Sequence, residues 1–273
     1  MKREALRALC ALPVFCAAAL LGGCALYGND RSQTGVLFAE ESGTTVSFYG
    51  VSSHLNGIGG DAALVYDKSE GTLAFREISA EISAENPVVL DGSDFPRYTW
   101  EVAEGYESLL DGVLALAEGT PHVQAYAIRT EEGALGLCNV YTGATGYLSG
   151  GGQIDAAKLA RGIFFSWDGE KITVLDEVQK GGIVAFGPCR FVYYFKRNYY
   201  AKAVGAEESV FLCEDVAYDT GVNHTSHASF GFTGEYFLVR FYCGYSDYRK
   251  DYELYRLFTM DGRELASLRI AFA

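Results

Sequence analysis

The chain has few basic residues, with 22 Lys and Arg against 35 Asp and Glu and a formal net charge of −13. A nucleic-acid partner would require a basic surface, so this balance argues against DNA and RNA. Proline is also scarce, at five residues, whereas Tyr (19) and Phe (17) are abundant. This composition favours β structure over disorder or a helical bundle. None of the seven cysteines forms a CxxC pair, so the sequence predicts no structural zinc site.

Long apolar runs are missing except near the amino terminus. There, Lys2, Arg3 and Arg7 precede an uncharged stretch over residues 8–21. This length is typical of a secretory signal and is short for a membrane-spanning helix, which needs roughly 20 residues. A run extended to Tyr27 would just reach spanning length, but no basic stop-transfer cluster follows it.

The residues Leu21-Gly22-Gly23-Cys24 resemble the lipobox of bacterial lipoproteins. The resemblance implies that residues 1–23 are a signal peptide, which is removed, and that Cys24 carries a diacylglyceryl thioether. It also implies a protein held at the cell membrane with its domain outside the cytoplasm. Position 25 is Ala rather than the Asp that commonly retains this family in the inner membrane, which leaves the outer membrane open in a two-membrane cell. Plain secretion and an uncleaved helix are the alternatives.

Residues 24–35 are polar and predict a short lipidated tether, followed by a single β-rich domain over residues 36–273. Removal of residues 1–23 discards three basic residues and one acid, which leaves about −15 by formal count. That charge argues against electrostatic attraction to anionic lipid. We therefore expect the lipid on Cys24 to hold the protein at the membrane alone.

Short turn signals recur between apolar runs and predict β-hairpins. They are Ser42-Gly43, Ser69-Glu70-Gly71, Glu132-Gly133, Asp168-Gly169 and Asp261-Gly262. Apolar residues three and four apart predict a helix within residues 100–119, and residues 154–162 resemble a shorter helix ending at Gly162. The fold predicted is mainly β and antiparallel, either a degenerate β-propeller or another sheet arrangement of the α+β type.

Several side chains suggest specific chemistry. An exported location permits disulfides, and Cys213 with Cys243 is the pair that we would test first. His224 and His227 are three residues apart and are the nearest approach to a metal-ligand pair, although their Gly/Ser/Thr/Asn-rich segment predicts solvated loop histidines. No nucleophile motif is found, so the sequence predicts no cofactor and leaves catalysis uncertain and not favoured.

Aromatic residues are dense between Phe191 and Phe258, with Lys and Arg interleaved. Tyr199 and Tyr245 are candidates for an exposed face that stacks on glycans or binds an envelope protein. Cross-strand packing inside a sheet explains the same density without any ligand. The function expected is a lipid-anchored binding or interaction domain. A hydrolase of envelope polymers or glycans and a structural subunit of an envelope complex are the alternatives.

Overall fold

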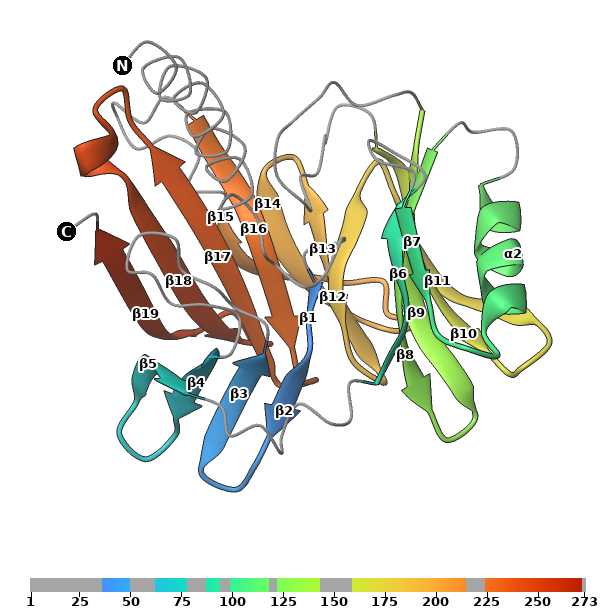
Figure 1. Cartoon of the computed structure of the whole chain (residues 1–273), viewed down its shortest axis with the longest axis horizontal. Coiled ribbons are helices and arrows are strands. Elements are labelled where there is room, and N and C mark those ends of the chain that lie inside the picture. Colours follow the sequence, from blue (N-terminus) through green and yellow to red (C-terminus); the bar gives the residue numbers. More distant parts are fainter. Residues whose placement is uncertain are drawn as a thin grey trace, which may run out of the picture.

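The computed structural model describes residues 36–49, 62–77, 87–93, 99–117, 122–142, 159–214 and 224–271. Four antiparallel sheets form a four-bladed β-propeller with one short α-helix (Figure 1). The predicted signal peptide, the tether and Cys24 lie outside the described residues. Among the helices that are described, none is both long and apolar enough to cross a membrane.

Blades 1 and 2 come first in the chain. Blade 1 has the strand order β2 (Ala39–Glu41), β3 (Thr45–Tyr49), β4 (Ala62–Asp67) and β5 (Thr72–Glu77). Blade 2 has the order β11-β10-β9-β8-β6-β7. Its elements are β6 (Val88–Ser93), β7 (Thr99–Val102), α2 (Glu107–Leu116), β8 (His122–Thr130), β9 (Gly133–Tyr141), β10 (Leu159–Trp167) and β11 (Ile172–Gln179).

Blades 3 and 4 follow. Blade 3 consists of β12 (Gly182–Phe186), β13 (Arg190–Phe195), β14 (Asn198–Ala203) and β15 (Val210–Glu214). Blade 4 consists of β16 (His224–Phe232), β17 (Tyr236–Gly244), β18 (Tyr252–Thr259) and β19 (Glu264–Ala271), with the short helix η2 (Tyr248–Lys250) between β17 and β18. A fifth strand, β1 (Val36–Leu37), joins blade 4 from the amino-terminal end of the domain.

The ring is closed by residues 36–41, the first segment that the structure describes. In β1, Val36 pairs with Phe230 of β16 in a parallel arrangement. After Phe38 the same segment continues as β2, where Ala39 pairs with Phe48 of blade 1. Residues 36–41 are therefore shared between blade 4 and blade 1, which ties the beginning of the domain to its end.

The first strands of blades 1, 3 and 4 end on the same face. A Cβ at Gly187, just after β12, would lie 2.7 Å from the Phe232 ring at the end of β16. Glu41, at the end of β2, accepts a hydrogen bond from Thr233 Oγ1 at 3.5 Å. We call the face where β12 and β16 begin the upper face, and the face where they end the lower face, as they lie in Figure 1.

Apolar side chains fill the spaces between blades. One cluster joins blades 3 and 4, a second joins blades 4 and 1, and a third joins blades 2 and 3. A fourth lies between blade 2 and α2, where Leu109 and Val113 are buried. Apolar clusters therefore cover the sheets where blades face one another. Several strands there, such as β4 and β12, show little alternation between buried and exposed residues, because few of their positions face water.

All five predicted turns connect adjacent strands, and the predicted helix within residues 100–119 is present as α2. The second predicted helix, over residues 154–162, is wrong for residues 159–162, which begin strand β10; residues 154–158 lie outside the described residues. Gly162 is not a helix cap. A Cβ there would lie 2.8 Å from the backbone nitrogen of Ile183, so glycine permits blades 2 and 3 to approach closely.

One buried amide links blade 2 to blade 3. Asn139 Nδ2 donates to the carbonyl oxygen of Ile183 at 2.8 Å, and Asn139 Oδ1 accepts from the nitrogen of Ile183 at 2.8 Å. The amide of Asn139 thus satisfies both backbone groups of Ile183 in β12, in the way that the backbone of a paired strand would. Asn139 is only 3% exposed, so water cannot replace these bonds if the amide is lost.

We expect Asn139→Ala to lower the free energy of unfolding by about 3 kcal/mol, because two buried backbone groups would lose their partners at roughly 1–3 kcal/mol each. The measurement is a urea unfolding curve. Gln179→Ala, at an exposed position on β11, is the control and should stay within about 0.5 kcal/mol of the wild type. Equal midpoints for the two variants would contradict a role for the amide in holding the blades together.

Candidate functional site

Tyr199 does not belong to an exposed face, which corrects the sequence-based hypothesis. Its side chain is fully buried, and its ring centroid lies 5.8 Å from that of Phe230 and 5.9 Å from that of Phe237. The reason is that side chains alternate between the two faces of β14, and Tyr199 lies on the face that packs against blade 4. Tyr199 pairs with Tyr194 of β13, and both side chains belong to the cluster between blades 3 and 4.

Tyr245 is half-buried and packs on the same cluster. Its backbone nitrogen donates to Asp251 Oδ1 at 2.7 Å, and its ring centroid lies 6.2 Å from that of Tyr252. Asp251 also accepts from the hydroxyl of Tyr242 at 2.5 Å. These contacts fix the connection between β17 and β18, so Tyr199 and Tyr245 do not form one surface.

A different set of aromatic residues reaches the surface of blade 3. Tyr193 pairs with Tyr200, and Tyr200 pairs with Phe211, so the three residues lie side by side across β13, β14 and β15. The Tyr193 and Tyr200 rings stack at 5.4 Å and 21°, and Phe211 meets Tyr200 edge-on at 5.9 Å. We call Tyr193, Tyr200 and Phe211 the aromatic ladder. Exposure rises along it to 48% at Phe211.

Polar contacts hold the ladder in place. The Tyr193 hydroxyl lies 3.0 Å from Ser209 Oγ, and Asn198 Nδ2 donates to the Tyr200 hydroxyl at 3.2 Å. Phe191 lies behind Tyr193 with centroids 6.2 Å apart, and Phe164 of blade 2 follows at 5.5 Å from Phe191. The ladder is therefore the outer end of an aromatic row that begins inside the propeller. Few side-chain rotamers would need to be frozen when a partner binds to such a surface.

An ion pair links the blade that carries the ladder to blade 2. Lys202 Nζ lies 2.8 Å from Asp176 Oδ1, and the backbone nitrogen of Gly205 donates to Asp176 Oδ2 at 2.9 Å. Burial alone would raise the pKa of Asp176, but the hydrogen bonds from Lys202 and Gly205 outweigh it and hold that pKa below its usual value. The Lys202 ammonium also lies 5.8 Å from the centre of the Phe191 ring.

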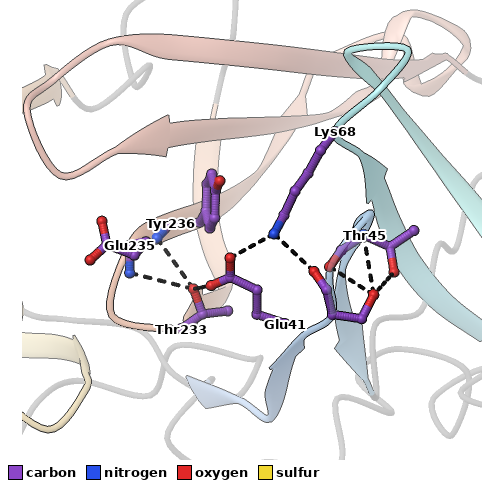
Figure 2. A network of polar contacts seen from close by, with 7 residues as sticks. Glu41, Thr45, Lys68, Thr233, Glu235 and Tyr236 are labelled. Atoms are coloured by element: carbon purple, nitrogen blue, oxygen red, sulfur yellow. Dashed lines mark hydrogen bonds and ion pairs between the residues drawn. The ribbon is translucent and has the colours of Figure 1, made fainter.

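A second polar network joins blades 1 and 4 at the lower face (Figure 2). Lys68 Nζ donates to Glu41 Oε1 at 2.6 Å and to the carbonyl oxygen of Ser42 at 2.9 Å, and it lies 5.5 Å from the centre of the Tyr236 ring. The hydrogen bond with Glu41 raises the pKa of Lys68 above its usual value. The hydrogen bonds of Lys68 all go to groups of the protein itself. We therefore interpret this network as a structural clasp at the end of residues 36–41.

The most deeply buried charges form a compensated group inside blade 4. Arg240 lies 3.0 Å from Glu253, and their side chains are 1% and 0% exposed. The hydroxyl of Tyr255 donates to the second oxygen of Glu253 at 3.0 Å. A buried charge is costly unless a partner of opposite charge neutralises it, and Arg240 and Glu253 neutralise each other. Its burial gives a substrate no route to these groups, so the contacts are structural.

Cys213 and Cys243 do not form the disulfide that the sequence suggested. Both side chains are buried as thiols in the cluster between blades 3 and 4. Cys213 lies on β15 and Cys243 on β17, so the two strands belong to different blades. Cys138 is also a buried thiol, whereas the thiol of Cys189 is exposed between β12 and β13.

His224 and His227 lie in strand β16 rather than in the expected loop. Their side chains fall outside the described part of the structure, so a metal at this pair stays an untested hypothesis. Among the side chains that are described, no three His, Cys, Asp or Glu residues gather as a metal site would require. The glycine-rich run before β10 also lies outside the described ranges.

Comparison with known proteins adds little to these observations. No protein-family model matches the chain, and no curated protein matches it. Among solved structures, the chain is similar to a member of the DUF4221 family from Bacteroides vulgatus, with 8% identity and a TM-score of 0.34. The similarity covers 88% of this chain and 82% of that one. At this level it supports no conclusion about function.

Tyr199 and Phe211 of blade 3 should respond differently to truncation. We expect Tyr199→Ala to lower the free energy of unfolding by about 3–5 kcal/mol, because a large buried ring leaves a cavity. Phe211→Ala, at a half-exposed position, should cost less than about 1 kcal/mol. Urea unfolding of both variants measures the difference. A small effect at Tyr199 and a large one at Phe211 would reverse the assignment of buried and exposed faces.

The Asp176–Lys202 pair should make stability depend on pH. A carboxyl whose pKa is lower in the folded than in the unfolded state stabilises the protein above the unfolded value of about 3.9, and this contribution is lost as the pH falls through the folded value. The difference in unfolding free energy between wild type and Asp176→Asn should therefore be constant from pH 5 to 7 and shrink below about pH 4. Glu170→Gln, at an exposed turn, should show little difference at any pH.

Proposed function

We propose that this protein is a lipid-anchored, extracytoplasmic binding module whose propeller contacts a partner protein of the bacterial envelope through the aromatic ladder of blade 3. Two independent features support the proposal. The sequence Leu21-Gly22-Gly23-Cys24 resembles a lipobox, and the aromatic ladder presents a pre-organised apolar surface on an otherwise acidic molecule. The ladder is the single observation that carries the binding role.

The composition of the ladder suits a protein contact. Tyrosine and other aromatic residues supply large contact areas and are enriched at the energetic centres of interfaces. The Tyr193 and Tyr200 rings cover part of each other's faces, which leaves less flat area for stacking on a sugar. A protein partner therefore fits this surface better than a glycan.

The anchor has a direct test. Cells grown with a labelled fatty acid should incorporate label into the wild-type chain and none into the Cys24→Ala variant, because the thioether requires the sulfur of Cys24. The mature mass should correspond to cleavage before Cys24. Label that persists in Cys24→Ala would refute the anchor, and it would do so whatever the role of the ladder.

The ladder is tested by site-specific photocrosslinking in intact cells. A photoreactive amino acid at position 211 should yield a specific adduct, whereas the same group at Val174, which is equally exposed on β11 of blade 2, should not. Tyr200→Ala should weaken binding of the captured partner by about 30-fold, the effect of losing roughly 2 kcal/mol at a central contact. Identical adducts at positions 174 and 211, or binding to purified peptidoglycan that depends on Tyr200, would contradict a protein partner.

A further inference from the structure

We infer that Asp176 of blade 2 is a positioning residue for the binding surface proposed on blade 3. Its carboxylate holds the connection between β14 and β15, residues 204–209, and that connection in turn fixes Tyr193 of the aromatic ladder. A neighbouring blade thereby sets the order of the surface that meets the partner. The inference rests on the binding role proposed above and deepens it, because it names the contact that controls the ladder.

A β-bulge in β11 turns the side chain of Asp176 toward blade 3. Val174 pairs with Phe165, whose ring belongs to the cluster beneath α2. Asp176 pairs with Phe164, whose ring belongs to the cluster between blades 2 and 3. Side chains two apart in a regular strand share a face, so the extra residue in the bulge, Leu175, moves Asp176 to the opposite face from Val174. The carboxylate therefore faces blade 3 because of a local irregularity in β11.

The Asp176 carboxylate meets one donor from β14 and one from the connection that follows it. Lys202 Nζ lies 2.8 Å from Oδ1, and the backbone nitrogen of Gly205 donates to Oδ2 at 2.9 Å. Gly205 has a φ of 73°, which residues with a Cβ rarely adopt, so the turn that presents this N–H favours glycine. The side chains of Asp176 and Lys202 are only 10% and 16% exposed, so salt screens their contact weakly.

The other contacts of the connection belong mainly to blade 3. The backbone nitrogen of Val204 donates to the carbonyl oxygen of Cys189 at 3.0 Å, and that of Ala206 donates to Ala203 at 3.0 Å. Val204 also packs on the apolar cluster between blades 2 and 3. Among the hydrogen bonds that the structure describes for residues 204–209, the one from Gly205 alone reaches blade 2. Asp176 is therefore the polar group through which blade 2 holds this connection.

The far end of the same connection holds the first ring of the ladder. Ser209 Oγ lies 3.0 Å from the hydroxyl of Tyr193. The Tyr193 ring stacks on Tyr200, and Phe211 meets Tyr200 edge-on. Displacement of the connection would remove the polar contact that fixes the Tyr193 ring and would loosen the stack. A looser ladder would bind its partner more weakly, because the rings would have to be ordered on binding.

Fluorine NMR of the ladder tests the inference without any partner. The full chain carries 3-fluorotyrosine in place of Tyr193, which keeps the hydroxyl. We expect Asp176→Ala to move the fluorine signal toward its position in the unfolded chain. Asp176→Asn keeps one oxygen that can accept from Gly205, so it should retain more of the wild-type shift. A wild-type signal in Asp176→Ala would overturn the proposal.

A double-mutant cycle tests whether Asp176 acts through Ser209. Ser209→Ala should move the fluorine signal in the same direction as Asp176→Ala, and the double variant should add little to the larger single change. Additive changes would overturn the route through the connection. If Asp176→Ala does not fold, Ser209→Ala still decides, because an unchanged Tyr193 signal in that variant would overturn the proposal.

Asn139→Ala is the matched control for the fluorine measurements. It weakens the junction of the same two blades at Ile183 and does not touch residues 204–209. The fluorine signal should therefore stay at its wild-type position. A shift equal to that of Asp176→Ala would show general loosening of the junction and would overturn a specific role for Asp176.

The effect on binding is measured with the photoreactive amino acid at position 211 in intact cells. At equal protein level, Asp176→Ala should lower the yield of the specific adduct by about fivefold, as expected when roughly one side chain must be ordered on binding. Glu170→Gln, at an exposed turn of blade 2, should leave the yield unchanged. Equal yields from the wild type and Asp176→Ala would overturn the proposal.

Failure of the binding role and failure of the positioning role give different results. A wild-type chain that forms no adduct at position 211 would overturn both. A wild-type adduct whose yield is unchanged in Asp176→Ala would overturn the positioning role alone and leave the binding role in place.

Discussion

The propeller depends on the closure of its ring by residues 36–41. This segment contributes β1 to the last blade and β2 to the first, so neither blade is complete without it. The partners of β1 are at the opposite end of the domain, and contacts between residues so distant in sequence are costly to form during folding. Local hairpins can form early, whereas the closed ring requires all four blades. The clasp of Lys68, Glu41 and Thr233 then secures the point where the segment ends (Figure 2).

Where blades meet, the packing is controlled by a few small or polar side chains. Asn139 pairs with the backbone of Ile183, and Gly162 leaves space for that contact. Elsewhere the blades meet through apolar clusters, which are less specific about distance and angle. A directional contact at one junction and a clasp at another fix the spacing of the blades, while the apolar clusters supply most of the stabilisation.

Much of the fold could be predicted from local patterns, because a hairpin turn is encoded by adjacent residues. All five predicted turns connect paired strands, and α2 follows the predicted periodicity. The number of blades could not be predicted, since the turns are unevenly spaced and blade 2 has six strands. The local sequence of residues 159–162 resembles the end of a helix capped by Gly162. The contact of Gly162 with Ile183 of blade 3, which explains the glycine, arises only from tertiary packing and cannot be predicted from local propensity.

The candidate site was missed for a similar reason. The sequence alone does not distinguish the four tyrosines of this hairpin, Tyr193, Tyr194, Tyr199 and Tyr200. The position of the turn decides which cross-strand pair faces outward. That turn consists of Lys196 and Arg197, both with positive φ, at 49° and 69°. Asn and Gly usually occupy such positions, so the sequence carries no strong turn signal there. A search for two-residue turns that pair one tyrosine with another would have placed Tyr200 opposite Tyr193.

The parallel pairing of β1 also has a mechanical consequence. If a lipid holds the chain ahead of β1, any pull on the domain away from the bilayer acts along the strand axis. The hydrogen bonds between β1 and β16 lie across that axis, so the load would be shared among them in shear instead of opening them one after another. The same direction of force continues into β2 and its pairing with β3. The domain would thus be tethered through a geometry in which strands resist separation better than they would if peeled from an edge.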